Sequence, residues 1–203
     1  MKAALMVIDM QNAFCRREGT MGRLGFNIDL LRAPIPRIQE LILAAHENNV
    51  FVIFTRYVYQ PDYSDGGILI SELFPQIREQ GGLREGTWDV ELIEELHASG
   101  HDIIIDKNRY SAFYKTELDS ILQGAGIDTL VVTGVTTNMC VESTVRDAHY
   151  RDYRVLVVRD ATGEVDPVRH EGALLSIQHG FGWVICAEEA LVAFRTVSAP
   201  ASD

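Results

Sequence analysis

The sequence predicts an α/β protein built on a six-stranded parallel sheet. Two observations lead to this prediction. Short apolar, β-branched segments recur along the 203 residues, and amphipathic segments of helical period separate most of them. The apolar segments are nearly continuous rather than alternating, which is typical of strands that are covered on both faces. Strands are expected at Ala4–Ile8, Val50–Thr55, Ile103–Ile105, Thr129–Thr133, Val155–Val158 and Trp183–Cys186.

Five helices are expected between and after these strands. The first, Ile35–Asn48, has prolines in and beside its first turn, where proline is favoured, and it carries apolar residues on one face. The others are expected at Glu117–Gln123, Asn138–Arg151, Pro167–His179 and Glu188–Phe194. Because no repeat or linker marks a second domain, we expect a single domain over residues 1–196 and a flexible tail over residues 197–203.

Two long segments, Met10–Ala33 and Arg56–Trp88, interrupt this alternation. Loops of this length in a compact domain are usually lids or binding loops. Both follow predicted strands, and open α/β sheets hold their ligands outside the carboxyl ends of the strands. We therefore expect a functional site beneath these two segments.

Composition and charge exclude several classes of partner. The chain has 18 Lys+Arg and 29 Asp+Glu, a formal net charge of −11, which disfavours binding to nucleic acid or anionic lipid. No apolar run is long enough for a membrane-spanning helix, and the N-terminus becomes acidic too early for a secretory signal. We expect a cytoplasmic protein with a small-molecule substrate, no nucleic-acid partner and no membrane partner.

The three cysteines, Cys15, Cys140 and Cys186, show no disulfide framework and no spacing typical of a zinc site. No glycine-rich phosphate loop follows the first strand. We expect no metal and no cofactor.

Three reactive side chains follow predicted strands and could meet at one edge of the sheet: Asp9, Lys107 and Cys140. A thiol becomes a strong nucleophile as a thiolate, and a helix N-terminus or a nearby cation lowers its pKa. Cys140 has both within reach, and Asp9 can act as general base and acid. Each residue alone has an ordinary structural role, so the coincidence of the three supports a nucleophilic triad.

Three sequence blocks carry a family resemblance. They are Val7–Phe14 (VIDMQNAF), Asp106–Phe113 (DKNRYSAF) and Val132–Ala148 (VTGVTTNMCVESTVRDA). In this order they resemble the isochorismatase-like cysteine hydrolases, and the third block is the most specific. The resemblance implies a three-layer α/β/α sandwich and a homo-oligomer, either a dimer or a tetramer.

The resemblance also implies roles for individual residues. Asp9 matches the acid/base, Lys107 its electrostatic partner, and Cys140 the nucleophile. A non-proline cis peptide is implied between Val135 and Thr136. It would turn the Thr136 N–H inward, to form an oxyanion hole with the Cys140 N–H.

Departures from the family pattern narrow the reaction. Isochorismatases proper lack the cysteine, so Cys140 favours C–N cleavage over vinyl-ether hydrolysis. Nicotinamidases hold a metal with histidines after the second strand, whereas this chain has no histidine between His46 and His97.

The middle of the chain is most similar to the ureidoacrylate and biuret-type amidohydrolases. The similar stretches are Gly86–Asp89, Arg109–Phe113, Leu118–Leu122 and Gly180–Val184. We expect a ureido, carbamoyl or amide substrate. Three alternatives stay open: an amidase of the nicotinamidase or N-carbamoylsarcosine amidase type, a vinyl-ether hydrolase, and a non-catalytic binding or assembly member of the fold.

Substrate contacts are expected from aromatic residues close in sequence to the triad and from three polar residues. Phe14, Tyr110 and Phe113 could wall an aromatic pocket. Polar contacts to a ureido group or a carboxylate are expected from Gln11, Asn12 and Arg56, since a guanidinium binds a carboxylate in bidentate fashion.

Overall fold

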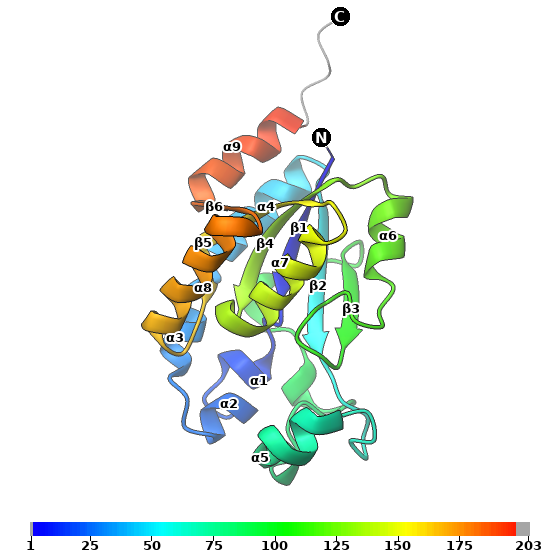
Figure 1. Ribbon diagram of the computed structural model, residues 1–203, viewed down its shortest axis with the longest axis vertical. Coiled ribbons are helices and arrows are strands. Elements are labelled where there is room, and N and C mark those ends of the chain that lie inside the picture. The colour runs from blue at the N-terminus through cyan, green and yellow to red at the C-terminus, as the bar shows by residue number, and fades with distance from the viewer. Residues whose placement is uncertain (1, 198–203) are drawn as a thin grey trace, which may run out of the picture.

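A computed structural model of the chain describes residues 2–197 and has the predicted α/β architecture (Figure 1). Its six strands form one parallel sheet in the order β3-β2-β1-β4-β5-β6. The strands are β1 (Ala3–Ile8), β2 (Phe51–Tyr57), β3 (Ile103–Lys107), β4 (Thr129–Val135), β5 (Arg154–Gly163) and β6 (Trp183–Ile185). Each lies at a predicted position, but β5 continues five residues beyond its predicted end at Val158.

Helices cover both faces of the sheet. Helices α4 (Ile35–Glu47) and α9 (Ala187–Val197) contact each other on one face, and α6 (Leu118–Gly124), α7 (Glu142–His149) and α8 (Pro167–Gly180) lie on the other (Figure 1). Within residues 2–197, no helix combines the length and apolarity that crossing a bilayer requires.

The last helix runs further than the sequence predicts. Residue 197, expected in the tail, is the last residue of α9. The rest of the predicted tail, residues 198–203, lies outside the described residues.

The winding of the sheet places a crevice at its centre. From β1 the chain adds β2 and β3 on one side, and from β4 it adds β5 and β6 on the other. Ligands of open α/β sheets bind where this direction reverses, here between the carboxyl ends of β1 and β4. Gly134 pairs with Ile8 at this point with φ +103°, and a Cβ there would lie 2.1 Å from the Ile8 carbonyl oxygen. Only glycine fits this close approach.

Two segments lie beyond the carboxyl ends of the strands, and we name them the first strap (residues 10–33) and the second strap (residues 58–90). They correspond to the two predicted long loops but contain short helical turns. The first has α1 (Asn12–Cys15), α2 (Thr20–Arg23) and α3 (Ile28–Arg32); the second has η1 (Leu69–Leu73), α5 (Pro75–Glu79) and η2 (Trp88–Val90). One further turn, η3 (Glu94–Leu96), precedes β3.

A buried carboxylate joins the two straps. Asp89 accepts hydrogen bonds from the Thr20 N–H (3.0 Å), the Thr20 hydroxyl (2.6 Å) and the Leu83 N–H (2.7 Å). Asp89 is itself 6% exposed. Because these donors come from both straps, the straps are held together over the end of the sheet (Figure 1).

Candidate active site

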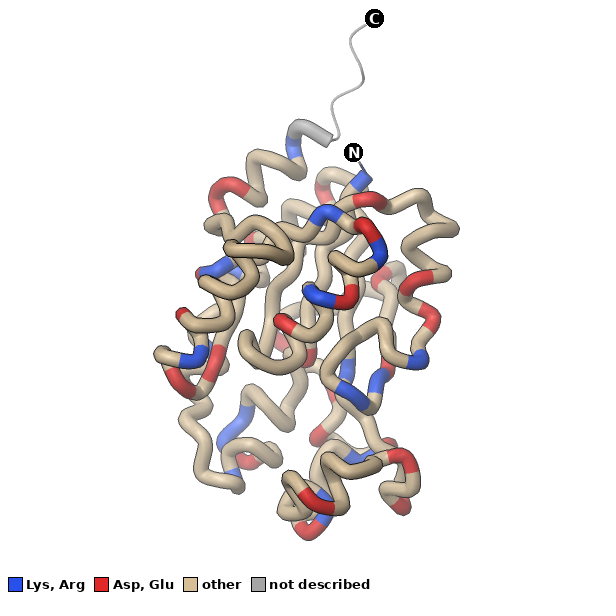
Figure 2. The backbone as a smooth tube through the Cα atoms, in the orientation of Figure 1, with Lys and Arg blue, Asp and Glu red and all other residues tan. Residues whose placement is uncertain are grey.

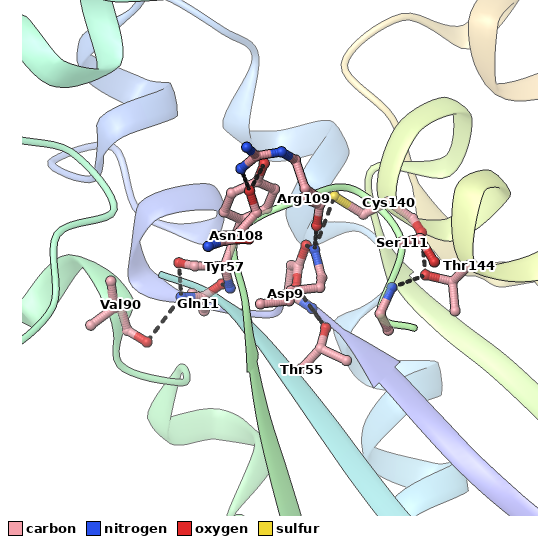
Figure 3. A network of polar contacts seen from close by, with 12 residues as sticks. Asp9, Gln11, Thr55, Tyr57, Val90, Asn108, Arg109, Ser111, Cys140 and Thr144 are labelled. Carbon is pink, nitrogen blue, oxygen red and sulfur yellow. Dashed lines mark hydrogen bonds and ion pairs between the residues drawn. The ribbon is translucent and has the colours of Figure 1, made fainter. Parts of the chain in front are cut away.

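Asp9, Lys107 and Cys140 meet at the carboxyl edge of the sheet (Figure 3). Asp9 follows β1, Lys107 ends β3, and Cys140 lies in the wide turn η4 (Thr137–Val141) that leads into α7. The Lys107 ammonium lies 2.7 Å from Asp9 Oδ2 and 3.5 Å from Cys140 Sγ. The side chains of Lys107 and Asp9 have no exposed surface. The structure therefore brings together the three side chains that the sequence singles out.

The three strands that precede or carry the triad residues are not all neighbours in the sheet. Strand β2 stands between β3 and β1, so Lys107 must reach across it. Its ammonium lies 4.2 Å above the centroid of the Tyr57 ring and also donates to the Arg109 carbonyl, at 3.1 Å. The cation–π contact and this hydrogen bond stabilise the buried charge along the way.

Asp9 is held by the backbone and side chain of β2. Its N–H donates to the Thr55 carbonyl at 3.2 Å, and the Thr55 hydroxyl donates to Asp9 Oδ1 at 2.6 Å. Asp9 has φ +53°, a left-handed conformation that aspartate tolerates better than most residues. With one carboxylate oxygen on Thr55 and the other on Lys107, the orientation of the Asp9 side chain is fixed.

The Cys140 thiol is held in its neutral form. Burial raises the pKa of the Cys140 thiol, the charge and hydrogen bond of Asp9 raise it further, and Lys107 lowers it by less. The expected lowering of this pKa is therefore wrong, because burying a thiolate beside a carboxylate costs more than the neighbouring cation returns. A neutral thiol needs a base to become a nucleophile, and Asp9 is the carboxylate in contact with this thiol.

The turn that carries Cys140 is tied to its surroundings on both sides. The peptide bond between Val135 and Thr136 is cis, directly before η4. After the turn, the Thr144 hydroxyl donates to the Cys140 carbonyl at 2.7 Å and accepts from the Ala112 N–H at 3.0 Å (Figure 3). The loop after β3 and the turn that carries Cys140 are thereby linked.

A cavity opens from Cys140 toward the straps. Thr136, Tyr57 and Tyr110 line it beside Cys140, and apolar side chains of both straps close the far side. The site thus lies beneath the two long segments, as the sequence predicts. Phe14, an expected aromatic contact, lines this cavity together with Tyr110.

The other predicted substrate contacts lie outside the cavity lining. Arg56 forms a bidentate ion pair with Asp106, with both distances 2.7 Å. Asn12 donates to the Trp88 carbonyl, and Gln11 donates to the carbonyls of Tyr57 and Val90.

Phe113 packs against Tyr153, with ring centroids 6.0 Å apart. Phe113 and the three polar residues thus contact other parts of the protein. Of the predicted substrate contacts, Phe14 and Tyr110 are the two that line the cavity.

The lining residues that the sequence analysis did not single out include Asn138, Glu164 and Arg169. Glu164 follows β5 directly and is 5% exposed, and burial raises the pKa of its carboxyl group. Its oxygens accept from the N–H groups of Val165 (2.9 Å) and Asn138 (3.3 Å). Its position after a strand is the signal that could have revealed it, had the full length of β5 been predicted.

Cys15 does not belong to the site. It is buried outside the cavity lining, and burial raises the pKa of its thiol to about 12.

Metal ligands are a separate question. Across residues 2–197, no group of three or more His, Cys, Asp or Glu side chains is arranged to hold a metal ion.

Known proteins are similar to this chain over most of its length. The isochorismatase domain model matches residues 3–189. The ureidoacrylate amidohydrolase RutB of Methylorubrum extorquens AM1 is 39% identical over 193 residues, which cover 89% of this chain and 77% of that protein. The RutB of Acinetobacter baylyi is 36% identical over 195 residues, covering 90% and 80%.

Solved structures agree with the sequence relatives. A cysteine hydrolase from Pseudomonas syringae pv. phaseolicola superposes with a TM-score of 0.88 at 31% identity, covering 96% of this chain and 93% of that one. An N-carbamoylsarcosine amidase from Thermoplasma acidophilum gives a TM-score of 0.73 at 29% identity, covering 93% and 98%. Sheet order and helix placement are therefore shared with enzymes of known fold.

Proposed function

Because the chain belongs to the isochorismatase domain family, we propose that it is a cysteine amidohydrolase that cleaves a C–N bond of a small ureido, carbamoyl or amide substrate. One observation carries this proposal: Lys107 is buried between Asp9 and Cys140, at the end of a cavity that could hold a small molecule. A carboxylate, a cation and a thiol in contact provide a base, an electrostatic partner and a nucleophile.

The first half of the reaction forms an acyl-enzyme. Asp9 accepts the proton of the Cys140 thiol while the sulfur attacks the substrate carbonyl carbon. The N–H groups of Thr136 and Cys140 stabilise the oxyanion of the tetrahedral intermediate. Asp9 then returns the proton to the nitrogen as the C–N bond breaks, so that ammonia or an amine leaves and a thioester on Cys140 remains.

The second half hydrolyses the thioester. Asp9, again a carboxylate, accepts a proton from water, and the resulting hydroxide attacks the thioester carbonyl. Collapse of the second intermediate releases the acid and restores the thiol with the proton from Asp9. Throughout, Lys107 balances the negative charge that moves between Asp9 and the sulfur.

The activities for which the relatives are named support the substrate class. RutB proteins are ureidoacrylate amidohydrolases, and one structural neighbour is an N-carbamoylsarcosine amidase. Both names describe cleavage at a carbonyl carbon bonded to nitrogen. The same triad chemistry can cleave ureides, carbamoyl compounds and simple amides. The proposal therefore names a class of substrates and not a single compound.

The test is ammonia release from a panel of ureides, carbamoyl compounds, primary amides and nicotinamide. We expect turnover of at least one compound, loss of that turnover in Cys140→Ser, and its retention in Cys186→Ser. Cys186 is a matched control because it is a partly exposed thiol outside the cavity lining. Absence of ammonia from every compound, or full activity in Cys140→Ser, would contradict the proposal.

We also propose that the enzyme works as a homodimer or homotetramer in the cytoplasm, where the nucleophilic thiol stays reduced. Several large apolar side chains on the outer surface support an association between copies, among them Leu175 (70% exposed) and Trp183 (55% exposed). Sedimentation equilibrium measures the assembly directly. A mass of 22.7 kDa, that of one chain, would contradict it.

A further inference from the structure

The wall of the cavity opposite the triad is apolar. The first strap contributes Met21, Leu24 and Phe26, and the second contributes Leu69, Phe74 and Ile77. These side chains come from segments that are joined to each other through Asp89. An apolar wall of this kind favours the binding of a hydrocarbon group, because burying apolar surface is favourable. It disfavours the binding of a charged group, because removing a charge from water is costly.

Two tyrosines of the lining, Tyr57 and Tyr59, add little polarity. The Tyr57 hydroxyl donates to the Asn108 carbonyl at 3.2 Å, and the Tyr59 hydroxyl donates to the Tyr57 oxygen at 3.0 Å. Both phenolic protons are therefore used within the protein. Burial also raises the pKa of both phenols, which keeps them uncharged.

Among the residues that line the cavity in the described part of the chain, the charged side chains are Glu164 and Arg169. Glu164 is buried, whereas the Arg169 side chain is 45% exposed and lies 3.6 Å from Asp166. Two guanidiniums near β3 are engaged elsewhere: Arg56, on the neighbouring strand, pairs with Asp106, and Arg109 donates to the Asp65 carbonyl. A substrate carboxylate would thus meet a buried acid without a dedicated cation.

Beside the nucleophile the cavity offers hydrogen-bond acceptors. Glu164 presents a carboxyl group there, and Asn138 Oδ1 is buried with no hydrogen-bond partner. A buried acceptor without a donor is costly, so a ligand that supplies N–H groups gains at this position. A primary amide or a terminal ureido group carries two such donors on its NH₂.

We propose that the substrate is an uncharged primary amide or ureide with an apolar substituent of several carbons. This inference rests on the proposed C–N hydrolase function and names its substrate class. The NH₂ group lies toward Glu164 and Asn138, and the substituent occupies the cavity beneath the straps. The reaction is R–CO–NH₂ + H₂O → R–COO⁻ + NH₄⁺, in which the C–N bond breaks and a C–O bond forms after the transient thioester on Cys140.

Matched substrates test the inference through kcat/KM for ammonia release. Butylurea and 3-ureidopropionate have similar length but differ in charge at the far end. We expect butylurea to be at least about tenfold better, and kcat/KM to rise about threefold per methylene from acetamide to hexanamide until the cavity is full. Preference for 3-ureidopropionate would overturn the inference and leave the hydrolase function standing, whereas no ammonia from any compound would overturn both.

Two variants test the residues that carry the argument. Phe74→Ala should lose about tenfold more kcat/KM with hexanamide than with acetamide, because only the longer chain reaches the strap wall. Leu73→Ala is the matched control, an adjacent side chain that is 63% exposed and outside the lining. Equal losses with both amides in Phe74→Ala would contradict an apolar subsite.

Glu164→Gln removes the buried negative charge while preserving shape. We expect the butylurea to 3-ureidopropionate ratio of kcat/KM to fall about tenfold, since Arg169 is then the charged residue that lines the cavity. A purely structural role of Glu164 would lower both rates in parallel. If the ratio of the two kcat/KM values stays unchanged in Glu164→Gln, Glu164 does not contribute to the selection against the anionic substrate.

Discussion

Lys107 is the residue on which the charge balance of the site depends. It forms the buried ion pair with Asp9 and is the cation in contact with Cys140. Removing one partner of such a pair leaves an uncompensated charge, which is strongly destabilising unless the remaining group binds a proton. In the absence of Lys107, the Asp9 carboxylate would have no cation beside it in the site.

We therefore predict that Lys107→Met lowers kcat by about a thousandfold, within the range that general acid–base catalysis supplies. Folding should persist with a lower free energy of unfolding, because Met fills most of the space of the Lys stem. Steady-state ammonia release and urea denaturation measure the two effects. Lys115→Met is the control, since this lysine lies over the Tyr114 ring and takes no part in the triad.

Asp9 has opposite effects on turnover and on thiol acidity. Its charge raises the pKa of Cys140, while Lys107 lowers it. In Asp9→Asn the thiol keeps the cation and loses the carboxylate, so its pKa should fall and its thiolate fraction at neutral pH should rise.

We predict that Asp9→Asn abolishes ammonia release yet accelerates alkylation of Cys140 by iodoacetamide. The midpoint of the alkylation rate against pH should move to lower pH than in the unaltered protein. Mass spectrometry of the peptide containing Cys140 follows the reaction. Slower alkylation in Asp9→Asn would mean that Asp9 does not hold the thiol proton.

At the scale of elements, the straps decide the shape of the cavity, and Asp89 holds them together. Its carboxylate accepts three hydrogen bonds from Thr20 and Leu83, all of them buried. We predict that Asp89→Ala costs about 2–4 kcal/mol of unfolding free energy, since buried donors lose a charged acceptor. Hydrogen exchange should increase in both straps and leave the sheet protected.

The matched control for Asp89 is Asp29→Ala. Asp29 also belongs to the first strap, but its ion pair with Arg17 is largely exposed, at 69% and 75% of the two side chains. Exposed ion pairs contribute about 0–1 kcal/mol. If the two substitutions lower the free energy of unfolding equally, the buried hydrogen bonds of Asp89 contribute no more to stability than the exposed ion pair of Asp29.

The triad and the sheet could be predicted from sequence because their signals are local. Asp9, Lys107 and Cys140 each follow or end a continuous apolar strand, and parallel strands bring such positions to one edge. Glu164 was not predictable in this way. The charged pair Arg159–Asp160 breaks the apolar run of β5, while a register shift against β4 lets the strand continue to Gly163.

The straps show a second limit of local signals. Their short helices carry no long amphipathic pattern, and their positions depend on contacts such as Thr20 with Asp89, which are 69 residues apart. Arg56 was predicted to contact substrate from the fit of a guanidinium to a carboxylate, and Phe113 from its nearness in sequence to Lys107. In the structure, they face Asp106 and Tyr153 instead.

At the scale of the whole molecule, net charge acts on any charged substrate. The chain carries a formal charge of −11, and acidic residues are distributed over its outer helices and loops (Figure 2). Such a field repels anions over about one Debye length, which is roughly 20 Å at 0.02 M salt and 4 Å at 0.5 M. An uncharged amide approaches without this penalty.

Ionic strength should therefore distinguish the two substrate classes in the same enzyme. Between about 0.02 M and 0.5 M NaCl, we predict that kcat/KM for butylurea changes little, while that for 3-ureidopropionate rises about two- to fivefold as screening removes the repulsion. The rise in kcat/KM should come from a lower KM, because the field acts on approach and binding rather than on the triad. A decrease with salt for the anion would instead reveal a local cationic attraction at the cavity mouth, with Arg169 as its source.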